Sequence, residues 1–582
     1  MKTLHTDVAI IGAGTAGLAA HRAARAAGKR ALLIEGGQYG TTCARVGCMP
    51  SKLLIAAAEA AHAAAHGGPF GVHIDGAVRI DGAQVMARVK SERDRFVGFV
   101  LEGVENIPAE DKLRGMARFV EDTVLRVDGH TEVRAGSVVI ASGSRPAVPP
   151  PFLALGDRLV VNDDVFAWDT LPARVAVFGP GVIGLELGQA LARLGVQVRV
   201  FGVSGSLGGI TDPRVRQSAR KAFQQEFYLD PDARVLETKR VGDEVEVRYV
   251  ALDNTERTER FDYALVATGR RPNVDGLDLH NTSLALDARG VPHFDRHTMQ
   301  AGQAPVFIAG DANADAPLLH EAADEGRIAG ENAARYPDVA PGLRRAALGV
   351  VFSDPQIALV GTPFARLESG TFVAGEVDFG DQGRSRVMLR NRGMLRVYAD
   401  IESGRFVGAE MVGPSAEHIG HLLAWAAQQS LTVAQMLEMP FYHPVVEEGC
   451  APPCAMPRRA WRRPARSAWR PEPQGFSRYC SVKPARSSWA SSRASSGMAG
   501  LSASCSVQGG LTRNMPLPCS PKPSAAGLRT VSVACSQLLT GSRSSWRAIS
   551  DASRRCTSGY QTTKVPVAKR LTPSRTAVSV RR

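Results

Sequence analysis

The sequence predicts an α/β fold that contains two units, each with a parallel sheet flanked by helices. The order strand, glycine-rich turn, helix and strand occurs near residue 10 and again near residue 177. In both places the strands are short apolar runs, which is typical of parallel strands buried on both faces. The length of 582 residues is sufficient for several domains of this kind.

The first unit has the pattern of a dinucleotide-binding domain. Its expected elements are a strand, a helix and a second strand at residues 8–11, 18–27 and 31–34. Gly12, Gly14 and Gly17 lie in and just after the turn that precedes the helix, and Glu35 follows the second strand. Such glycines let a pyrophosphate approach the backbone, the helix N-terminus attracts its charge, and the carboxylate accepts the ribose hydroxyls. This complete order predicts a Rossmann-like domain.

The second unit repeats this design with one difference. Its expected elements are a strand from residue 175, a helix at 185–194 and a strand at 196–201. The glycines are Gly179, Gly181 and Gly184, but Gly202 stands at the position that corresponds to Glu35. A carboxylate there is typical of NAD binding, whereas NADP binding needs cations, and the loop 202–207 supplies neither. The unit therefore predicts a nicotinamide dinucleotide site that leaves both NAD and NADP open, with NAD favoured.

Cys43 and Cys48 are the only cysteines in the first 449 residues. Residues five apart in a regular helix are separated by about 7.5 Å along the axis, beyond the roughly 7 Å over which a disulfide closes. The segment must therefore bend, and Gly47 supplies the freedom. We expect a helix over residues 53–65 whose N-terminal end favours a thiolate. The spacing alone favours a structural bridge or two unrelated core thiols over a redox-active pair.

The segment Cys43-Ala-Arg-Val-Gly-Cys48-Met-Pro-Ser-Lys52 resembles the redox-active motif of the class I pyridine nucleotide-disulfide oxidoreductases. This family of flavin disulfide reductases includes dihydrolipoamide dehydrogenase, glutathione reductase and mercuric reductase. The resemblance extends over residues 4–449, and the runs 141–146, 267–273 and 306–311 follow in the family order. It implies FAD in the first unit, NAD(P)(H) in the second, and electron transfer through a Cys43–Cys48 disulfide to or from a small dithiol or disulfide.

The resemblance also assigns roles to individual residues. Cys48 would face the flavin and Cys43 would exchange with the substrate, while Lys52 would pair with Glu186. Without the resemblance, these two charges would be interpreted as solvated helix residues. A base is needed for the dithiol, and the resemblance gives this role to His443, oriented by Glu448. The implied FAD residues are Gly12, Gly14, Gly17, Glu35, Lys52, Ser142, Gly143, Gly310 and Asp311. The implied NAD(P) residues are Gly179, Gly181, Gly184 and Gly269, and no metal site is expected.

In the family, this histidine reaches the dithiol of the other subunit, so the resemblance implies a homodimer with an α+β dimerisation domain. The expected domains are an FAD-binding domain at 1–149 and 273–342, an NAD(P)-binding domain at 150–272, the dimerisation domain at 343–449 and a basic tail at 450–582. The family's final helix would follow Gly449, but its pattern is missing from this sequence. We therefore expect a weakened dimer and reduced activity if the tail is real protein.

Within the family, Pro50-Ser51-Lys52 favours the dihydrolipoamide dehydrogenase branch. Glutathione reductases usually have Lys in place of Ser51. Mercuric reductases have an adjacent cysteine pair near the C-terminus, which this sequence lacks and which a frame change near Gly449 would erase. Four residues that border the disulfide substrate depart from the usual pattern, namely Thr41, Arg45, Phe441 and Val445. These departures leave lipoamide open as the substrate, and the expected substrate is a small dithiol or disulfide.

Charge separates the tail from the rest of the chain. The net charge is +13, but 23 of the 70 basic residues and only two of the 57 acidic residues follow Cys450, so the tail carries +21 and the remainder −8. The tail is rich in Ser, Arg and Pro and lacks periodicity, which favours a frame change near Gly449. The alternatives are a disordered nucleic-acid-binding extension and an inactive relative whose tail disables it.

We expect neither a signal peptide nor a membrane span, because residues 7–11 already belong to a buried strand and no run of eighteen apolar residues occurs in the body. With two cysteines in the first 449 residues, a reducing compartment fits better than secretion, so the expected location is the cytoplasm.

Overall fold

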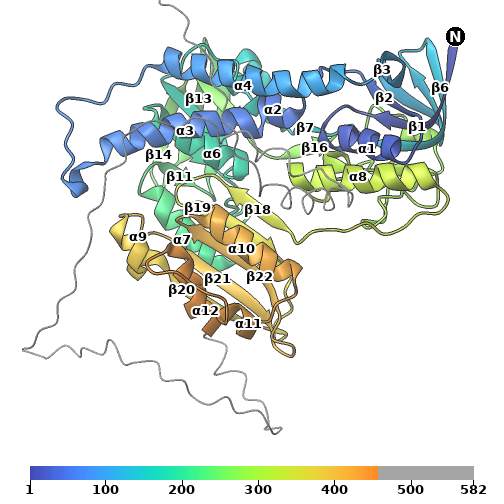
Figure 1. The fold of residues 1–582 in the computed structure, drawn as a ribbon. Coiled ribbons are helices and arrows are strands. Elements are labelled where there is room, and N and C mark those ends of the chain that lie inside the picture. Colours follow the sequence, from blue (N-terminus) through green and yellow to red (C-terminus); the bar gives the residue numbers. More distant parts are fainter. Residues whose placement is uncertain (456–582) are drawn as a thin grey trace, which may run out of the picture. The chain divides into compact units, whose positions relative to one another are not determined.

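The computed structural model describes residues 1–455, and the expectations for the tail from residue 456 onward lie outside the described residues. Figure 1 shows that the described part contains parallel sheets with helices on their faces and a further antiparallel sheet. The mixed α/β class predicted from the sequence is confirmed. Among the helices of residues 1–455, none combines the length and the apolar character that a bilayer crossing requires.

The first sheet has seven strands in the order β3-β2-β1-β6-β5-β4, with β17 also paired to β6. These strands are β1 (Lys2–Ile11), β2 (Ala31–Glu35), β3 (Lys112–Arg114), β4 (Ala117–Glu121), β5 (Val124–Val127), β6 (Thr131–Ile140) and β17 (Val306–Ile308). Strand β1 pairs in parallel with β2 and β6, with Val8 opposite Ala31 and Ser137. Helices α1 (Thr15–Ala26) and α8 (Leu319–Arg335) lie side by side (Figure 1).

Glycine permits the close approach of α1 and α8. A Cβ atom on Gly326 would lie 2.2 Å from the carbonyl oxygen of Ala16, and one on Gly330 would lie 2.4 Å from that of Ala20. Both distances are far below van der Waals contact, so any side chain at either position would separate the helices. The N-terminus of α1 is therefore held at a fixed depth against α8.

The second sheet is parallel, in the order β11-β10-β9-β15-β8. Its strands are β8 (Leu159–Val160), β9 (Arg174–Phe178), β10 (Gln197–Phe201), β11 (Tyr228–Asp230) and β15 (Tyr263–Val266), with helices α5 (Asn162–Val165), α6 (Val182–Arg193) and α7 (Pro213–Gln224) in the same region. An antiparallel sheet of β12 (Arg234–Val241), β13 (Glu244–Val250) and β14 (Glu256–Phe261) is inserted before β15. The short strands β7 (Ser144–Pro146) and β16 (Arg270–Pro272) pair antiparallel where the chain enters and leaves this region.

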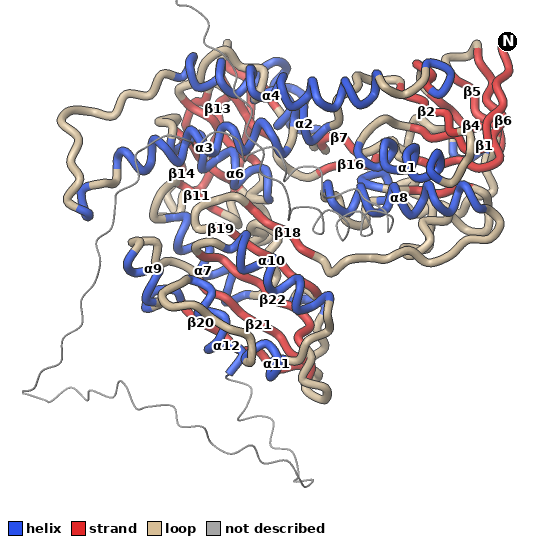
Figure 2. The backbone as a smooth tube through the Cα atoms, viewed as in Figure 1, coloured by secondary structure: helices blue, strands red, loops and turns tan. Residues whose placement is uncertain are grey.

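The third sheet is antiparallel, in the order β18-β19-β22-β21-β20. Its strands are β18 (Leu348–Val351), β19 (Gln356–Gly361), β20 (Phe372–Asp378), β21 (Met394–Asp400) and β22 (Phe406–Gly413). Helix α10 (Ala416–Gln428) packs on β19 and β22, as Figure 2 shows, and the other helices here are α9 (Gly383–Val387), α11 (Val433–Leu437) and α12 (Ala451–Ala455). Cys450 and Cys454 are buried in the core of this sheet, so the ordered fold continues beyond Gly449.

The cysteine segment consists of three helices, α2 (Thr42–Val46), α3 (Cys48–Ala65) and α4 (Gly82–Glu105). Helix α3 packs against α4 and against α6 of the second sheet. Its buried residues include Leu54 and Ala58, which join the core that also contains Leu187 and Leu191 of α6. The dithiol segment is thus fixed against helix α6 of the second sheet.

Three helices begin earlier than the sequence predicts. Helices α1 and α6 start at Thr15 and Val182, three residues before the expected starts, so Gly17 and Gly184 lie inside the first turn. A Cβ atom on Gly17 would stand 1.8 Å from the carbonyl oxygen of Gly12, which explains why the helix tolerates a glycine there. Helix α3 starts at Cys48 and not at residue 53, because Pro50 in a first turn gives up no intrahelical hydrogen bond.

Candidate functional site

Cys43 and Cys48 lie on either side of a sharp bend at Gly47. Helix α2 ends at Val46, Gly47 has φ −125° and ψ −117°, and α3 begins at Cys48. A Cβ atom on Gly47 would approach the Cα atom of Cys43 to 3.2 Å, so glycine allows the two helices to fold back on each other. The bend predicted from the spacing is therefore present, and both cysteines are free thiols in this structure.

The two thiols have different acidities. The neighbouring Cys43 thiol, acting as a hydrogen-bond donor, and the Lys52 ammonium lower the pKa of Cys48 to about 7, against the opposing effect of burial. The pKa of Cys43 is raised, first by its hydrogen bond to Cys48 and then by burial. Cys48 is also the first residue of the 18-residue helix α3, where the helix dipole favours a negative charge. Cys48 is therefore the thiolate of the pair and Cys43 the thiol.

Lys52 stands one turn after Cys48 on α3 and forms an ion pair with Glu186 of α6. Its Nζ atom lies 2.8 Å from Oε1 and 2.7 Å from Oε2 of the carboxylate. The Glu186 side chain is only 4% exposed and that of Lys52 is 33% exposed, so the carboxylate is shielded from water and the ammonium only in part. The structure thus brings together the lysine and glutamate that the family resemblance implies, next to the dithiol.

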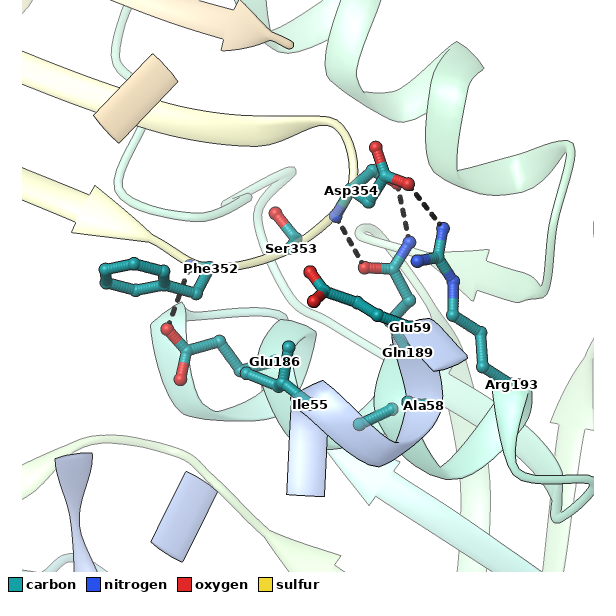
Figure 3. A pocket seen from close by; sticks show the side chains of 10 residues that line it. Ile55, Ala58, Glu59, Glu186, Gln189, Arg193, Phe352, Ser353 and Asp354 are labelled. Carbon is teal, nitrogen blue, oxygen red and sulfur yellow. Dashed lines mark hydrogen bonds and ion pairs between the residues drawn. The ribbon is translucent and has the colours of Figure 1, made fainter. Parts of the chain in front are cut away.

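Phe352 is a third member of this group, which the sequence did not indicate as a site residue. It belongs to the turn between β18 and β19, and its ring centroid lies 4.5 Å from Nζ of Lys52. Its backbone N–H donates to Oε1 of Glu186 at 2.9 Å. Figure 3 shows the contact between the Phe352 backbone and Glu186, with Ser353 and Asp354 further along the same turn. Residues 350–356 resemble part of the family's dimerisation domain, and this resemblance is the only sequence signal for Phe352.

The first glycine turn is shaped for a pyrophosphate. A Cβ atom on Gly12 would lie 2.3 Å from the carbonyl oxygen of Ala141, which leaves no room for a side chain. Gly14 has no atom within 4 Å of its Cβ position, so its face is open toward the helix N-terminus. The Glu35 carboxylate at the end of β2 accepts hydrogen bonds from the backbone N–H groups of Ala13 and Gly37, at 2.7 and 2.6 Å. These residues fit the adenosine half of FAD.

The residues predicted for the other half of FAD also converge here. A Cβ atom on Gly310 would lie 2.9 Å from the Cβ atom of Ala16, so the turn that holds Asp311 packs on the start of α1. Oδ2 of Asp311 accepts a hydrogen bond from Ser144 at 2.6 Å. In the described part of the chain, Oγ of Ser142 is buried and has no hydrogen-bond partner. A polar atom of this kind fits a bound polar group, and Gly143 next to it is open.

Buried Glu325 of α8 fixes the position of the Asp311 turn. Its carboxylate accepts from the backbone N–H of Gly310 at 2.8 Å and from the side chain of Asn313 at 2.7 Å. Arg344 pairs with it at 2.8 Å, whereas burial raises the pKa of the Glu325 carboxyl. Glu325 and Arg344 were not predicted from the sequence, because the fold brings them together with the Gly310 N–H and the Asn313 side chain from other parts of the chain.

The second glycine turn has the same construction as the first. A Cβ atom on Gly179 would lie 2.4 Å from the carbonyl oxygen of Ala267, and one on Gly184 would lie 1.9 Å from that of Gly179. Gly181 has open space, as Gly14 does, and so does Gly269 after β15. The four glycines predicted for NAD(P) therefore gather at the carboxyl ends of β9 and β15, where ligands bind in such sheets.

Gly202 directly follows β10, in a position where a side chain has no room. A Cβ atom there would lie 2.6 Å from Cγ of Pro180 and 2.8 Å from the carbonyl oxygen of Pro231. The Gly202 N–H donates to the carbonyl oxygen of Asp230 at 2.7 Å. The residue that usually reads the ribose is therefore absent, and the space for its side chain is closed as well.

His443 lies apart from the dithiol of its own chain. Its Nδ1 atom is 2.9 Å from Oε1 of Glu448, and this contact lowers the pKa of the Glu448 carboxyl. The His443 side chain is 83% exposed, and within residues 1–455 it forms no hydrogen bond to Cys43 or Cys48. The histidine and glutamate thus form a surface pair that points into solvent.

Two glycine turns of this kind and a dithiol with one acidic thiol define a flavin-dependent oxidoreductase that handles electrons in pairs. The chain belongs to the pyridine nucleotide-disulphide oxidoreductase family, whose model matches residues 6–326. A second model, the dimerisation domain of this family, matches residues 348–452. The family binds FAD and a pyridine nucleotide. The family assignment made from the sequence is confirmed, and the protein is a dihydrolipoyl dehydrogenase-like flavoprotein oxidoreductase.

Individual relatives agree with this assignment. Dihydrolipoyl dehydrogenase of Haloferax volcanii is 31% identical over 459 residues, which are 76% of this chain and 94% of the relative. Dihydrolipoyl dehydrogenase of Bacillus subtilis is 30% identical over 431 residues, 72% of this chain and 91% of the relative. Among solved structures, LpdA of Mycobacterium tuberculosis has a TM-score of 0.66 at 24% identity, covering 78% of this chain and 99% of that one. This last similarity concerns the fold.

Proposed function

We propose that this protein transfers electrons between NAD(P)(H) and a small dithiol or disulfide, with lipoamide as the best candidate substrate. The Cys43–Cys48 pair would cycle between disulfide and dithiol, next to FAD bound at the first glycine turn. FAD, when bound, exchanges an electron pair with the dithiol and with the nicotinamide. Residues 1–149 and 273–342 would form the FAD-binding domain, 150–272 the NAD(P)-binding domain and 343–449 the dimerisation domain.

A single observation carries this proposal. Cys48 begins helix α3 beside the ion-paired Lys52, and the hydrogen bond from Cys43 together with the Lys52 ammonium brings its pKa to about 7, while Cys43 stays a thiol. A structural disulfide does not require two thiols with different pKa values. Thiol–disulfide exchange benefits from this difference, because a low pKa makes Cys48 the better leaving group.

The exchange conserves electrons and atoms. One substrate thiolate attacks Sγ of Cys43, the Cys43–Cys48 bond breaks, and Cys48 leaves as a thiolate held near Lys52. The second substrate thiol loses its proton to His443 and attacks the substrate sulfur bound to Cys43. The mixed disulfide then breaks, which releases the oxidised substrate and leaves Cys43 reduced. Two electrons have moved from the substrate to the protein dithiol.

His443 would act on the dithiol of a partner subunit. The pair of His443 and Glu448 lies on the surface, and the Glu448 carboxylate would orient the imidazole and stabilise its charged form. Helix α10 of the same region exposes Leu422 and Trp425, at 45% and 67%. Apolar side chains at this spacing on one helix face suit a contact between two copies. We therefore propose a homodimer in which each site is completed by the other chain.

Substrate and dinucleotide are the finer parts of the proposal. The relatives named as dihydrolipoyl dehydrogenases support lipoamide. NAD is favoured because no arginine occurs in the loop 202–207 that could hold a 2′-phosphate. Because the dithiol works in a reducing compartment, we place the protein in the cytoplasm.

The experiment is anaerobic reduction of the purified protein, first with NADH and then with NADPH, followed by reoxidation with lipoamide, glutathione disulfide or mercuric ion. We expect NADH to reduce the protein faster and lipoamide to reoxidise it. Thiol counting before and after reduction should show a gain of two thiols on the peptide that contains Cys43 and Cys48. A colourless preparation, or reduction without this gain, would contradict the proposal.

A further inference from the structure

The turn between β18 and β19 belongs to the third sheet, yet its residues contact the groups next to the dithiol. Phe352 gives its backbone N–H to Glu186 at 2.9 Å and its ring to the Lys52 ammonium at 4.5 Å. Lys52 in turn lowers the pKa of Cys48. One residue of the C-terminal sheet thus contacts both members of the ion pair that acts on the thiolate.

Gln189 of α6 holds this turn by pairing with its backbone. Its Oε1 atom accepts from the N–H of Asp354 at 2.7 Å, and its Nε2 atom donates to the carbonyl oxygen of the same residue at 2.7 Å. Arg193, one helical turn further on, donates to Oδ2 of Asp354 at 3.0 Å. Figure 3 shows Gln189 and Arg193 reaching Asp354 from the same helix that presents Glu186 to Phe352.

We infer that Gln189 and Phe352 are positioning residues that act on Cys48 through the Glu186–Lys52 ion pair. Gln189 fixes the backbone of the β18–β19 turn, and the turn holds the carboxylate and the ammonium in one arrangement. This inference rests on the proposed redox role of Cys48. It makes the C-terminal sheet a part of the redox centre of its own chain, in addition to any role in pairing two chains.

Burial makes the loss of these hydrogen bonds costly in free energy. Gln189 and Glu186 are each 4% exposed, so water cannot replace a lost hydrogen bond at either side chain. A buried donor or acceptor left unpaired costs about 1–3 kcal/mol. An ammonium over an aromatic ring gains attraction from the ring face, and more so when water is excluded. Loss of the turn would therefore release Lys52, whose side chain is 33% exposed, toward solvent and away from Cys48.

The contacts described above run from Cys48 at one end to Asp354 at the other, and each of these residues has charged neighbours. Cys48 is influenced by Cys43, Lys52 and Glu186. Around Asp354, the neighbouring arginines Arg193, Arg390 and Arg392 keep the pKa of its carboxyl below the usual range, although burial alone would raise it. Asp354 is therefore a fixed anion in the working pH range, and Arg193 stays paired with it. The contact between Arg193 and Asp354 therefore keeps its charges over the pH range in which Cys48 loses its proton.

The test measures the thiolate midpoint of Cys48 in the flavin-loaded protein. In a Cys43→Ser background, Cys48 is the only thiol of the pair, and its alkylation by iodoacetamide is followed against pH on the peptide that contains it. Gln189→Met removes both hydrogen bonds to Asp354 and keeps the length of the side chain. Phe352→Leu removes the ring and keeps the backbone N–H. We expect both changes to raise the midpoint by roughly half to one pH unit.

Two variants serve as controls. Gln224→Met removes another amide contact to a backbone carbonyl, the partly buried 2.8 Å bond from Gln224 to the Leu229 carbonyl oxygen, in α7 away from the dithiol. Gln224→Met should lower the melting temperature and leave the thiolate midpoint of Cys48 unchanged. Phe352→Tyr keeps an aromatic face over Lys52, so its midpoint should equal that of the protein with Phe352.

A purely structural role predicts lower melting temperatures with no change of midpoint in folded Gln189→Met and Phe352→Leu proteins, and this result would overturn the inference. If Gln189→Met does not fold, Phe352→Leu decides alone. The proposed function fails separately, if the protein with both cysteines gains no thiols on reduction by NADH or NADPH. A midpoint shift remains measurable in that case.

Discussion

Lys52 and Glu186 are 134 residues apart in the sequence, yet Nζ of the lysine lies within 2.8 Å of both carboxylate oxygens. The lysine comes from the helix that begins with Cys48, and the glutamate comes from the helix that follows the second glycine turn. One ion pair therefore connects the dithiol segment to the unit that contains the second glycine turn. Its charges also oppose each other at Cys48, where Lys52 lowers the thiol pKa and Glu186 raises it.

Replacing Lys52 by Met should raise the pKa of Cys48. The ammonium favours the thiolate, and a favourable charge at such distances is worth roughly one to two pKa units. At neutral pH the variant would then hold Cys48 mostly as a thiol, and dithiol exchange should slow at least about tenfold. Lys52→Arg keeps the charge and should retain the midpoint. The measurement is the pH dependence of Cys48 alkylation in the Cys43→Ser background, and equal midpoints for Met and Lys would refute the role of the ammonium.

The hydrogen bond from Cys43 should contribute more to the acidity of Cys48 than Lys52 does, because it is the largest cause of the lowered pKa. A serine at position 43 can still donate to the thiolate, whereas an alanine cannot. We expect a midpoint near pH 7 in Cys43→Ser and a clearly higher one in Cys43→Ala. Since the pKa of Cys48 lies below its ordinary value, the thiolate should persist above pH 7 and disappear below it. The same alkylation series measures both variants.

The sequence allowed the prediction of those parts of the site that depend on local pattern. Glycine spacing identified the two turns, because a helix start against a strand end admits no other residue at Gly12 or Gly17. The two cysteines and the bend between them follow from helix geometry. The ion pair of Lys52 with Glu186 came only from the family resemblance, since two charges so far apart carry no local signal.

The contacts made by the third sheet could not be predicted from the sequence. Gln189 pairs with the backbone of a residue 165 positions away, and a backbone partner leaves no trace in residue type. The same holds for Glu325, which binds the N–H of Gly310. The closed space around Gly202 could not be predicted either. The sequence shows that the acidic residue is missing, but it does not show that Pro231 lies next to Gly202.

Gly202→Glu should fail to create an NAD-selective site. The added Cβ atom would meet Pro180 at 2.6 Å and the Pro231 carbonyl oxygen at 2.8 Å. Overpacking of this kind costs about 1–3 kcal/mol, so the melting temperature should fall. Val203→Glu is the matched control, because Val203 is 73% exposed and an acid there should weaken NADPH binding without unfolding the protein. Titration with both dinucleotides tests this, and a stable Gly202→Glu protein with stronger NADH binding would contradict the steric argument.

Gly326→Ala should destabilise the crossing of α1 and α8 and weaken flavin binding. The new methyl group would stand 2.2 Å from the Ala16 carbonyl oxygen, in the first turn of the helix that follows the glycine turn. We expect a loss of about 1–3 kcal/mol and partial loss of bound FAD. Gly98→Ala in α4 is the control, because its Cβ position is open and alanine should stabilise the helix by about 0.5–1 kcal/mol. The measurements are the melting temperature and the flavin content of each protein. Gly326→Ala should lower the melting temperature and Gly98→Ala should raise it, and equal shifts in the two proteins would contradict the steric argument.

Co-expression of two inactive variants should restore activity if His443 acts across a dimer. Cys43→Ser lacks the exchanging thiol and His443→Gln lacks the base, so each homodimer should be inactive. Random pairing gives about half mixed dimers, and each of these has one complete site, so about a quarter of the wild-type rate should return.

The observation behind this expectation is that the His443 side chain is 83% exposed and pairs with Glu448, with no hydrogen bond to the dithiol of its own chain within residues 1–455. Differently tagged subunits allow the mixed dimer to be purified and its lipoamide turnover measured. A mixed dimer with no activity would show that His443 does not serve the partner dithiol, whereas activity in His443→Gln alone would remove it from the mechanism.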